Sequence, residues 1–370
     1  MPVDRGRVVL ATARVPTLEG NLAALDRAMR DRFPRRRPVL LLEPYSYGLL
    51  GKLRYLGRLI RGTYYVRTSG LFVVDNAYLP IHLAPHRAAT TVVQVWHAAG
   101  ALKRFGRDGR APLRDPERRF LHRHYDYVVC TAEQSRGAWS AAFGVPLERV
   151  LPLGTPRTDF FADEAALGRA RQRVLDRYPA LAGRRVILHA PTFRGRGIAK
   201  QAAAGLDPKQ LRAALGPDDA LVLKTHPNLR PGATDTSGYD LVVDPQLELN
   251  WLLAATDILI TDYSSAIFEY ALLRRPLVLL VPDLETYEAD PGLYLDYRRE
   301  MIGSQVQDTD GVIAAIAAND FDLRPYEAFI DRHFGASVGQ ASDRFVERFL
   351  GPRAVRQGRD GTLRPDVRHE

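Results

Sequence analysis

The chain has 370 residues, of which 46% are hydrophobic and 26% charged; this composition excludes a disordered protein and suits two domains of about 150–200 residues each. Its 52 Lys and Arg residues outweigh 43 Asp and Glu residues, and the net charge of +9 favours an anionic partner such as nucleic acid, membrane or phosphorylated substrate. A single cysteine, Cys130, excludes an internal disulfide. Without a signal core or an apolar run of about 18 residues, we expect a soluble or peripheral protein.

Short aliphatic runs alternate with amphipathic stretches along the chain. The runs are nearly continuous rather than alternating, as expected for parallel strands buried on both faces. They predict strands at Val8–Ala11, Val39–Leu42, Leu71–Val74, Thr91–Val95, Tyr127–Cys130, Val186–His189, Leu221–Lys224, Leu241–Val243, Ile258–Thr261 and Leu277–Val281. Helices are predicted at Gly20–Arg32, Ala132–Phe143, Asp163–Arg177, Pro208–Leu215 and Ser265–Leu273. Repeated βα units of this kind predict doubly wound α/β domains.

The predicted strands fall into two sets. A turn-rich stretch at 153–157 separates them and predicts domains at residues 1–155 and 156–345. The tail at 352–370 is rich in Arg, Gly, Asp and Pro, and we expect it to be disordered.

The stretch Tyr47–Arg61 has leucines at helical spacing with basic residues beside them. This pattern is typical of an interfacial helix on anionic lipid, and the alternative is an ordinary amphipathic helix packed on the first sheet. The apolar residues are Leu49, Leu50, Leu53, Leu56, Leu59 and Ile60, and the basic ones are Lys52, Arg54, Arg58 and Arg61.

A histidine, His97, ends the strand that begins at Thr91, and small residues follow it. A histidine at a strand end is a reasonable general base for an acceptor hydroxyl, since its ordinary pKa is about 6.5. Lys103 and Arg104 follow downstream, where they could meet a phosphate of the acceptor. The alternative for His97 is a core histidine beside Trp96.

Two further strand ends carry cationic and hydroxyl groups. Thr192 and Arg194 follow one strand, and Arg is a good bidentate partner for phosphate, although an exposed turn is the alternative. Lys224 and His226 follow the next, where ligands of open α/β sheets bind. They could neutralise a diphosphate and protonate the departing group, or His226 could be a structural turn residue.

The stretch Ile258–Tyr270 is the most informative in the chain. A strand ends at Thr261-Asp262, and then Ser264 and Ser265 open a helix, whose free amides and dipole suit phosphate. One of the serines could equally be only a helix cap. Glu269 shares a helix face with Ser265 and could accept hydrogen bonds from a ribose, or be a solvated side chain.

Other nucleotide motifs are absent from the sequence. No P-loop and no G-x-G-x-x-G motif occurs, and the two D-x-D triplets, Asp308–Asp310 and Asp320–Asp322, are interpreted as a helix cap and a turn. We therefore expect neither a metal site nor a cofactor.

Together the motifs resemble those of the CDP-glycerol glycerophosphotransferase family of teichoic acid synthesis, which includes glycerol and ribitol phosphate transferases, both primases and polymerases. The matching stretches are Gln94-x-Trp96-His97, Lys103-Arg104-x-x-Gly106, Ala190-Pro-Thr-Phe-Arg194, Lys224-x-His226-Pro227, Thr261-Asp-Tyr-Ser-Ser265, Phe268-Glu-Tyr-Ala-Leu-Leu-x-x-Pro-Leu277, Asp283-Leu-x-x-Tyr287 and Gly292-x-Tyr294-x-Asp296-Tyr297. They cover residues 90–300 well. Many members have Trp-His-Gly-Thr where this chain has Trp96–Ala99, and Asp where it has Glu269.

The resemblance implies a GT-B architecture of two Rossmann-like domains facing a cleft, with CDP-glycerol or CDP-ribitol mostly on the second domain. It implies His97 as base and His226 near the donor phosphates. The expected reaction transfers glycerol phosphate, or a related polyol phosphate, to a hydroxyl of a lipid-linked cell-wall polymer or its primer. We expect a cytoplasmic enzyme, peripheral on the inner face of an anionic membrane.

Two other functions stay open at this point. A GT-B glycosyltransferase would use the same nucleotide frame with a nucleotide sugar, and a non-catalytic lipid- or polymer-binding module would keep a degenerate site. Nucleic acid is not an expected partner, because the Arg residues are spread along the chain and no recognition motif appears.

Overall fold

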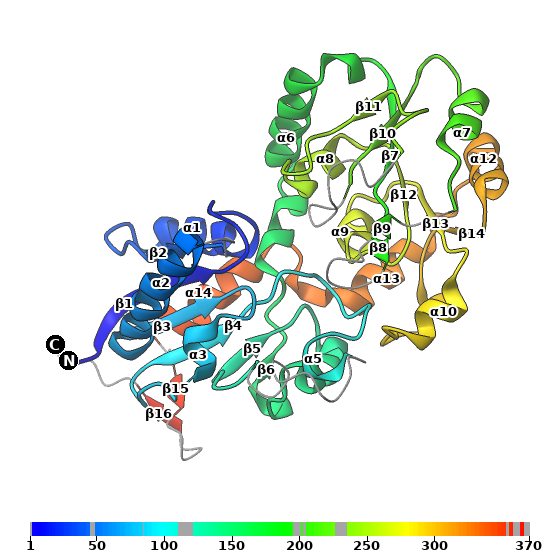
Figure 1. The fold of residues 1–370 in the computed structure, drawn as a ribbon. Helices are drawn as coiled ribbons and strands as arrows, with labels where there is room; N and C mark the ends of the chain where they lie inside the picture. The colour runs from blue at the N-terminus through cyan, green and yellow to red at the C-terminus, as the bar shows by residue number, and fades with distance from the viewer. Residues whose placement is uncertain are drawn as a thin grey trace. The chain divides into compact units, whose positions relative to one another are not determined.

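The computed structural model describes residues 2–44, 49–83, 85–109, 121–194, 201–202, 205–225, 235–352, 355–357 and 363–365. It divides the chain into two compact units (Figure 1). Unit 1 comprises Met1–Asp159 together with His333–Glu370, and unit 2 is the uninterrupted segment Phe160–Arg332. The chain therefore leaves unit 1 once and returns to it.

Unit 1 is built on a six-stranded parallel sheet of order β2-β1-β3-β4-β5-β6. Its strands are β1 (Asp4–Thr12), β2 (Val39–Leu42), β3 (Ser69–Val74), β4 (Thr91–Gln94), β5 (Tyr127–Val129) and β6 (Val150–Leu151). Its described α-helices are α1 (Gly20–Arg32), α2 (Leu49–Thr68), α3 (Leu79–Leu83), α5 (Arg136–Phe143) and α14 (Ala341–Leu350). The order reverses between β1 and β3, which makes the carboxyl ends of these strands the expected place for a ligand.

Alternate residues of β1 serve two cores, one on each face of this sheet. Val9 and Ala11 belong to a core with Phe143 of α5, whereas Val8 and Leu10 belong to the core that α1 and α14 cover. Both faces of the strand are therefore apolar, which explains its continuous hydrophobic run.

The C-terminal helix α14 corrects the predicted domain boundary, which assigned residues up to 345 to the second domain. Phe345, Val346, Phe349 and Leu350 are buried in the core of unit 1. The apolar stripe of α14 predicts a helix that must pack on something. It does not say which sheet, because the sheet of unit 1 ends at Leu151, far from α14 in the sequence.

Unit 2 has a six-stranded parallel sheet of order β11-β10-β7-β12-β13-β14. Its strands are β7 (Arg185–His189), β10 (Asp219–Leu223), β11 (Leu241–Val242), β12 (Ile258–Thr261), β13 (Leu277–Leu280) and β14 (Ser304–Val306), with a small antiparallel pair, β8 (Phe193–Arg194) and β9 (Gln201–Ala202). Its described α-helices are α6 (Glu164–Arg177), α7 (Pro208–Ala214), α8 (Leu249–Ala255), α9 (Ala266–Ala271), α10 (Leu284–Ala289), α11 (Tyr297–Glu300), α12 (Thr309–Ala318) and α13 (Pro325–His333). Here the strand order reverses between β7 and β12.

All ten predicted strands are present, and the predicted α/β class with two doubly wound sheets is confirmed. The sheet-edge strands β6 and β14 were not predicted, because two or three residues are too short for a hydrophobic run. In the tail, expected to be disordered, β15 (Val355–Gln357) pairs antiparallel with β16 (Leu363–Pro365). Composition alone does not reveal such a short hairpin.

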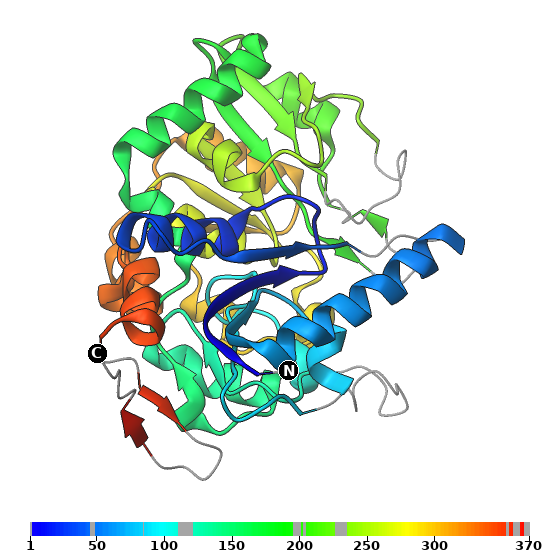
Figure 2. The ribbon, with the colours of Figure 1, turned by 90° about the vertical axis from the view of Figure 1, so that its left-hand side faces the viewer.

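Helix α2 contains residues 49–61 of the predicted lipid-binding stretch and appears as a long blue helix in Figure 2, whereas residues 47 and 48 lie outside the described residues. Leu56, Ile60 and Tyr64 are 55%, 66% and 41% exposed and lie at successive i, i+4 positions on one face. Arg58 corrects the prediction: it is buried, donates to the carbonyl oxygen of Glu43 and lies over the ring of Tyr78. Its charge therefore holds α2 in the fold.

The predicted lipid-facing set divides as follows. Arg54 and Arg61 are exposed, and Arg61 forms an ion pair with Glu43. Leu59 is half-buried. The side chains of Leu49, Leu50, Lys52 and Leu53 lie outside the part that the structure describes.

Candidate active site

In unit 2, most of the predicted site residues lie at one edge of the sheet. Lys224 follows β10, Thr192 and Arg194 follow β7, and the two serines follow β12. These strands are neighbours in the order β10-β7-β12, and the next strand, β13, is followed by Asp283. Since all are parallel, their carboxyl ends meet at the same edge, where the strand order reverses.

Arg194 is the centre of a charged cluster at this edge. Its Nε and Nη2 donate to the two carboxylate oxygens of Asp283 at 2.7 and 3.2 Å, and its Nη1 donates to Asp262 at 2.8 Å. Thr192 also binds Asp262, through its amide at 2.9 Å and its hydroxyl at 2.8 Å. Although burial opposes the charged form of Arg194, the hydrogen bonds and charges of Asp283 and Asp262 raise its pKa above the ordinary value.

Three tyrosines enclose the Arg194 cluster. The rings of Tyr263 and Tyr287 stack with centroids 3.7 Å apart, and the guanidinium of Arg194 lies 5.0 Å from the centroid of Tyr263. The hydroxyl of Tyr263 donates to Asp283 at 3.0 Å, and that of Tyr297 donates to the carbonyl oxygen of Asp262 at 2.7 Å. The guanidinium is thus held by both charge and ring contacts.

Asp262, Asp283 and these tyrosines were not predicted as site residues. Each belongs to a stretch that carries the family resemblance, such as Thr261–Ser265 and Asp283–Tyr287. Motif membership was the available signal, but spacing along the chain could not show that the two aspartates share one arginine.

The two serines differ in what they bind. The hydroxyl of Ser264 accepts the amide of Ala266 at 3.2 Å, so it satisfies one free amide at the start of α9. Ser265 holds the N-cap position without a side-chain capping bond, and both serines are half-buried. Glu269 is 1% exposed, so the solvated alternative is wrong.

Lys224 is buried, and its Nζ donates to the carbonyl oxygens of Pro245 and Leu247 at 3.1 and 2.7 Å. These bonds fix an ammonium group beside the carboxyl end of β10. His226 lies outside the described residues.

In unit 1, His97 follows β4 and is half-buried. Its Nδ1 lies 3.2 Å from the carbonyl oxygen of Asp75, which can only accept, so Nδ1 carries the proton and Nε2 is left as an acceptor. Burial and the charge of Arg14 lower the pKa of His97 to about 3. The ring is therefore neutral at pH 7, as a general base requires.

The surroundings of His97 contain polar groups that were not predicted. Asn21 donates to the carbonyl oxygens of Val95 and Trp96 at 3.2 and 2.8 Å and accepts the amide of Arg157 at 2.9 Å. It thereby fixes the turn, in which Trp96 has a φ of +52°. Arg14 lies 3.7 Å from the carboxylate of Asp75, which follows β3. These residues come from separate stretches of the chain, so no local motif unites them.

Lys103 and Arg104 also lie in unit 1 and are half-buried. Arg104 forms an ion pair with Asp108 at 3.2 Å, four residues further along the chain. Within the described residues, no group of three or more His, Cys, Asp or Glu side chains could hold a metal ion.

Comparison with known proteins identifies the family. Residues 1–351 match the family described as CDP-glycerol:poly(glycerophosphate) glycerophosphotransferase. The chain is 33% identical to a teichoic acid ribitol-phosphate primase of Bacillus spizizenii over 95% of its own length and 93% of the primase. It is 35% identical to a poly(ribitol-phosphate) polymerase of the same organism, over 80% of this chain and 49% of the polymerase. A glycerol-phosphate primase of Bacillus subtilis is 29% identical, with 79% of this chain and 77% of that one covered.

Among solved structures, a variant of the wall teichoic acid polymerase TagF, soaked with CDPG, is similar with a TM-score of 0.75 and 22% identity. The match covers 93% of this chain and 88% of that one. This likeness concerns the fold, and with it the predicted GT-B class is confirmed. On the strength of the match over residues 1–351, the chain belongs to the CDP-glycerol:poly(glycerophosphate) glycerophosphotransferase family.

Proposed function

We propose that this chain transfers a polyol phosphate from a CDP-linked donor to a hydroxyl group of a lipid-linked teichoic acid or its primer. One observation carries the proposal: Lys224, Thr192, Arg194 and the two serines lie at the carboxyl ends of three adjacent strands, where the order of a Rossmann sheet reverses. Cationic and hydroxyl groups at that point suit a nucleoside diphosphate.

The donor side is assigned to unit 2. Arg194 and Lys224 neutralise the diphosphate, and Ser265, whose hydroxyl does not cap α9, donates to a phosphate oxygen. The carboxylate of Glu269 accepts from the ribose, and His226 protonates the departing CMP.

The acceptor side is assigned to unit 1. Nε2 of His97 takes the proton of the acceptor hydroxyl. The oxygen of that hydroxyl attacks the phosphorus that carries the polyol, and the bond from this phosphorus to CMP breaks. In the free protein, burial and the nearby Arg14 hold the pKa of His97 at about 3. A bound phosphate beside Arg14 offsets that positive charge and raises the basicity of His97 when the acceptor is present.

The transferred polyol is glycerol phosphate or ribitol phosphate. The relatives support ribitol phosphate, since those named for it are 31–35% identical to this chain, whereas those named for glycerol phosphate are 27–30% identical. The sequence motifs alone instead favoured glycerol phosphate.

Attachment to the inner face of the membrane is the remaining part of the proposal. No described helix is both long enough and apolar enough to cross a bilayer. The exposed residues Leu56, Ile60 and Tyr64 of α2 form an apolar stripe, with Arg54 and Arg61 exposed on the same helix. This combination suits the interface of an anionic membrane.

The test is a donor panel of CDP-ribitol, CDP-glycerol and UDP- and GDP-sugars with a lipid-linked disaccharide, in which nucleotide release is measured. We expect CMP release from a CDP-polyol only. Nucleoside diphosphate release from a sugar donor would instead establish a glycosyltransferase, and binding of CDP without turnover would indicate a non-catalytic module.

A further inference from the structure

Almost all hydrogen-bonding capacity of Arg194 is already used within unit 2. A guanidinium has five N–H groups. Four of the five donate here: two to Asp283, one to Asp262 and one to the hydroxyl of Thr192 at 3.0 Å. A phosphate could therefore receive a bidentate pair of bonds from Arg194 only if one aspartate gave up its place.

The two aspartates differ in how firmly they are held. The side chain of Asp262 is 4% exposed and accepts two further bonds from Thr192. The side chain of Asp283 is 34% exposed, and besides Arg194 it binds the hydroxyl of Tyr263. Asp262 is thus the permanent partner, and Asp283 is the one that solvent or a ligand can reach.

The side chain of Asp283 also has a second possible set of hydrogen-bond partners, at the start of α10. It holds the N-cap position of α10, where an Asp side chain normally accepts the amides of the first turn, but it makes no such bond here. Its carboxylate points to Arg194 instead. If its side chain turned toward α10, the two bonds with the guanidinium would be replaced by bonds with free amides. The carboxylate of Asp283 would therefore still have hydrogen-bond donors after it left Arg194.

We propose that Asp283 is an exchangeable stand-in for the donor phosphate: its carboxylate occupies the bidentate face of Arg194 until the diphosphate of the donor replaces it. Carboxylate and phosphate present the same pair of acceptor oxygens to a guanidinium. Asp283 is thus a positioning residue that keeps Arg194 aligned between turnovers. This inference deepens the proposed function and rests on it.

The test measures binding of CDP and of inorganic pyrophosphate by titration calorimetry to Asp283→Asn and Asp283→Ser. Ser keeps the ability to cap α10, so at least this variant should fold. We expect both ligands to bind about fivefold more tightly, since an ion pair of this exposure that competes with them is lost. The KM of the CDP donor should fall with it, without a rise in kcat. A purely structural Asp283 would weaken binding instead.

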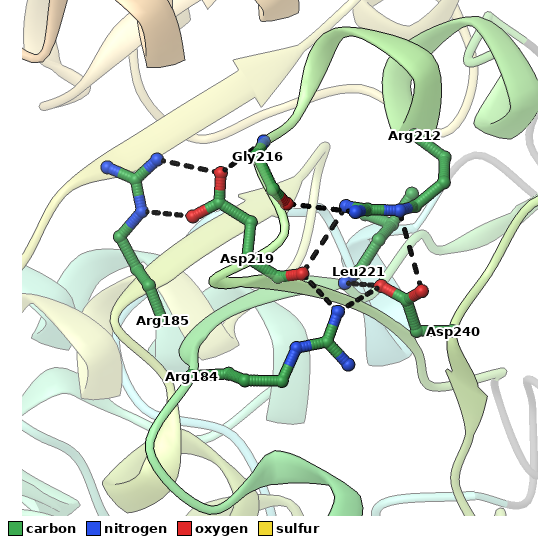
Figure 3. Close-up of polar contacts among 7 residues, drawn as sticks. All are labelled: Arg184, Arg185, Arg212, Gly216, Asp219, Leu221 and Asp240. Atoms are coloured by element: carbon green, nitrogen blue, oxygen red, sulfur yellow. Dashed lines mark hydrogen bonds and ion pairs between the residues drawn. The ribbon is translucent and has the colours of Figure 1, made fainter.

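The matched control is Asp219→Asn. Asp219 forms a bidentate pair with Arg185 at 2.7 and 3.1 Å, nearly the same geometry, at the other edge of the same sheet (Figure 3). The variant Asp219→Asn should leave the affinities for CDP and for pyrophosphate unchanged.

Weaker or unchanged binding in folded Asp283 variants would overturn the exchange while leaving the proposed function standing. Conversely, if the wild-type protein preferred UDP to CDP but pyrophosphate still bound more tightly to Asp283→Ser, the proposed function would fail and the exchange would stand.

Discussion

The two edges of the unit 2 sheet carry similar bidentate Arg–Asp pairs in opposite charge balance. At the amino edge, Figure 3 shows Arg184, Arg185 and Arg212 around Asp219 and Asp240, with guanidinium groups also bonded to the carbonyl oxygens of Gly216 and Asp219. Three guanidiniums thus face two carboxylates. At the carboxyl edge, one guanidinium, Arg194, faces two carboxylates.

The surroundings of the two pairs differ as well. Arg185 is 38% exposed, whereas Arg194 is 22% exposed and lies against the rings of Tyr263 and Tyr287. A cavity of about 300 Å³ adjoins Arg185 and Asp219 at the amino edge. Neither a cavity nor an arginine pair therefore marks a site by itself, and the position on the sheet carries more information.

If chemistry is confined to the carboxyl edges, loss of His97 should have the largest effect. We expect His97→Ala to lower turnover by about 10²–10⁴-fold, because the acceptor hydroxyl loses its base. Donor affinity, measured by titration with CDP, should stay nearly intact. The control is Arg7→Gln, since Arg7 lies in β1 and bonds Thr68 at 3.1 Å. Full activity of folded His97→Ala would refute the base assignment.

Replacing the arginine at each edge of the unit 2 sheet tests directly whether only the carboxyl edge takes part in the reaction. Arg194→Gln should lower kcat/KM for the CDP donor by about 10²-fold, because a charge that neutralises the diphosphate is lost. Arg185→Gln, at the amino edge, should change it by less than about twofold. Equal losses in both variants would mean that Arg194 acts only through stability.

The same contrast should appear in stability. Asp262→Asn deprives Arg194 of a carboxylate whose side chain is only 4% exposed. We expect the free energy of unfolding to fall by about 3 kcal/mol. Asp240→Asn deprives Arg184 of a carboxylate whose side chain is 24% exposed. This change should lower the free energy of unfolding by less than about 1 kcal/mol. Urea unfolding followed by circular dichroism measures both. A similar loss in each would show that burial does not distinguish the edges.

The smallest effect is expected away from both edges, on α2. Leu56→Ser with Ile60→Ser should weaken binding to anionic vesicles about tenfold while leaving the melting temperature unchanged, because both side chains are exposed. Leu147→Ser is the control, since Leu147 is 48% exposed outside α2. If vesicle binding persists in the double variant, this stripe is not the membrane contact.

Much of the fold could be predicted because strands buried on both faces appear as continuous apolar runs, as in Val8–Ala11. The position of Arg194 and Ser264 could be predicted because strand ends are visible in the sequence. Their partners could not, since Asp283 reaches Arg194 across 89 residues. Arg58 misled the sequence analysis for a similar reason: a basic residue beside leucines suggests lipid headgroups, whereas Glu43 and Tyr78 surround it.

The double passage of the chain between its units has a consequence for exchanging parts among relatives. Unit 2 is one uninterrupted segment, Phe160–Arg332, so it can be transplanted between homologous chains as a single cassette. Unit 1 cannot be obtained by truncation, because deletion after residue 332 removes α14 and exposes the core that Phe345 and Phe349 complete. Chimaeras that carry the cassette of a glycerol-phosphate relative would therefore separate the contribution of each unit to polyol choice.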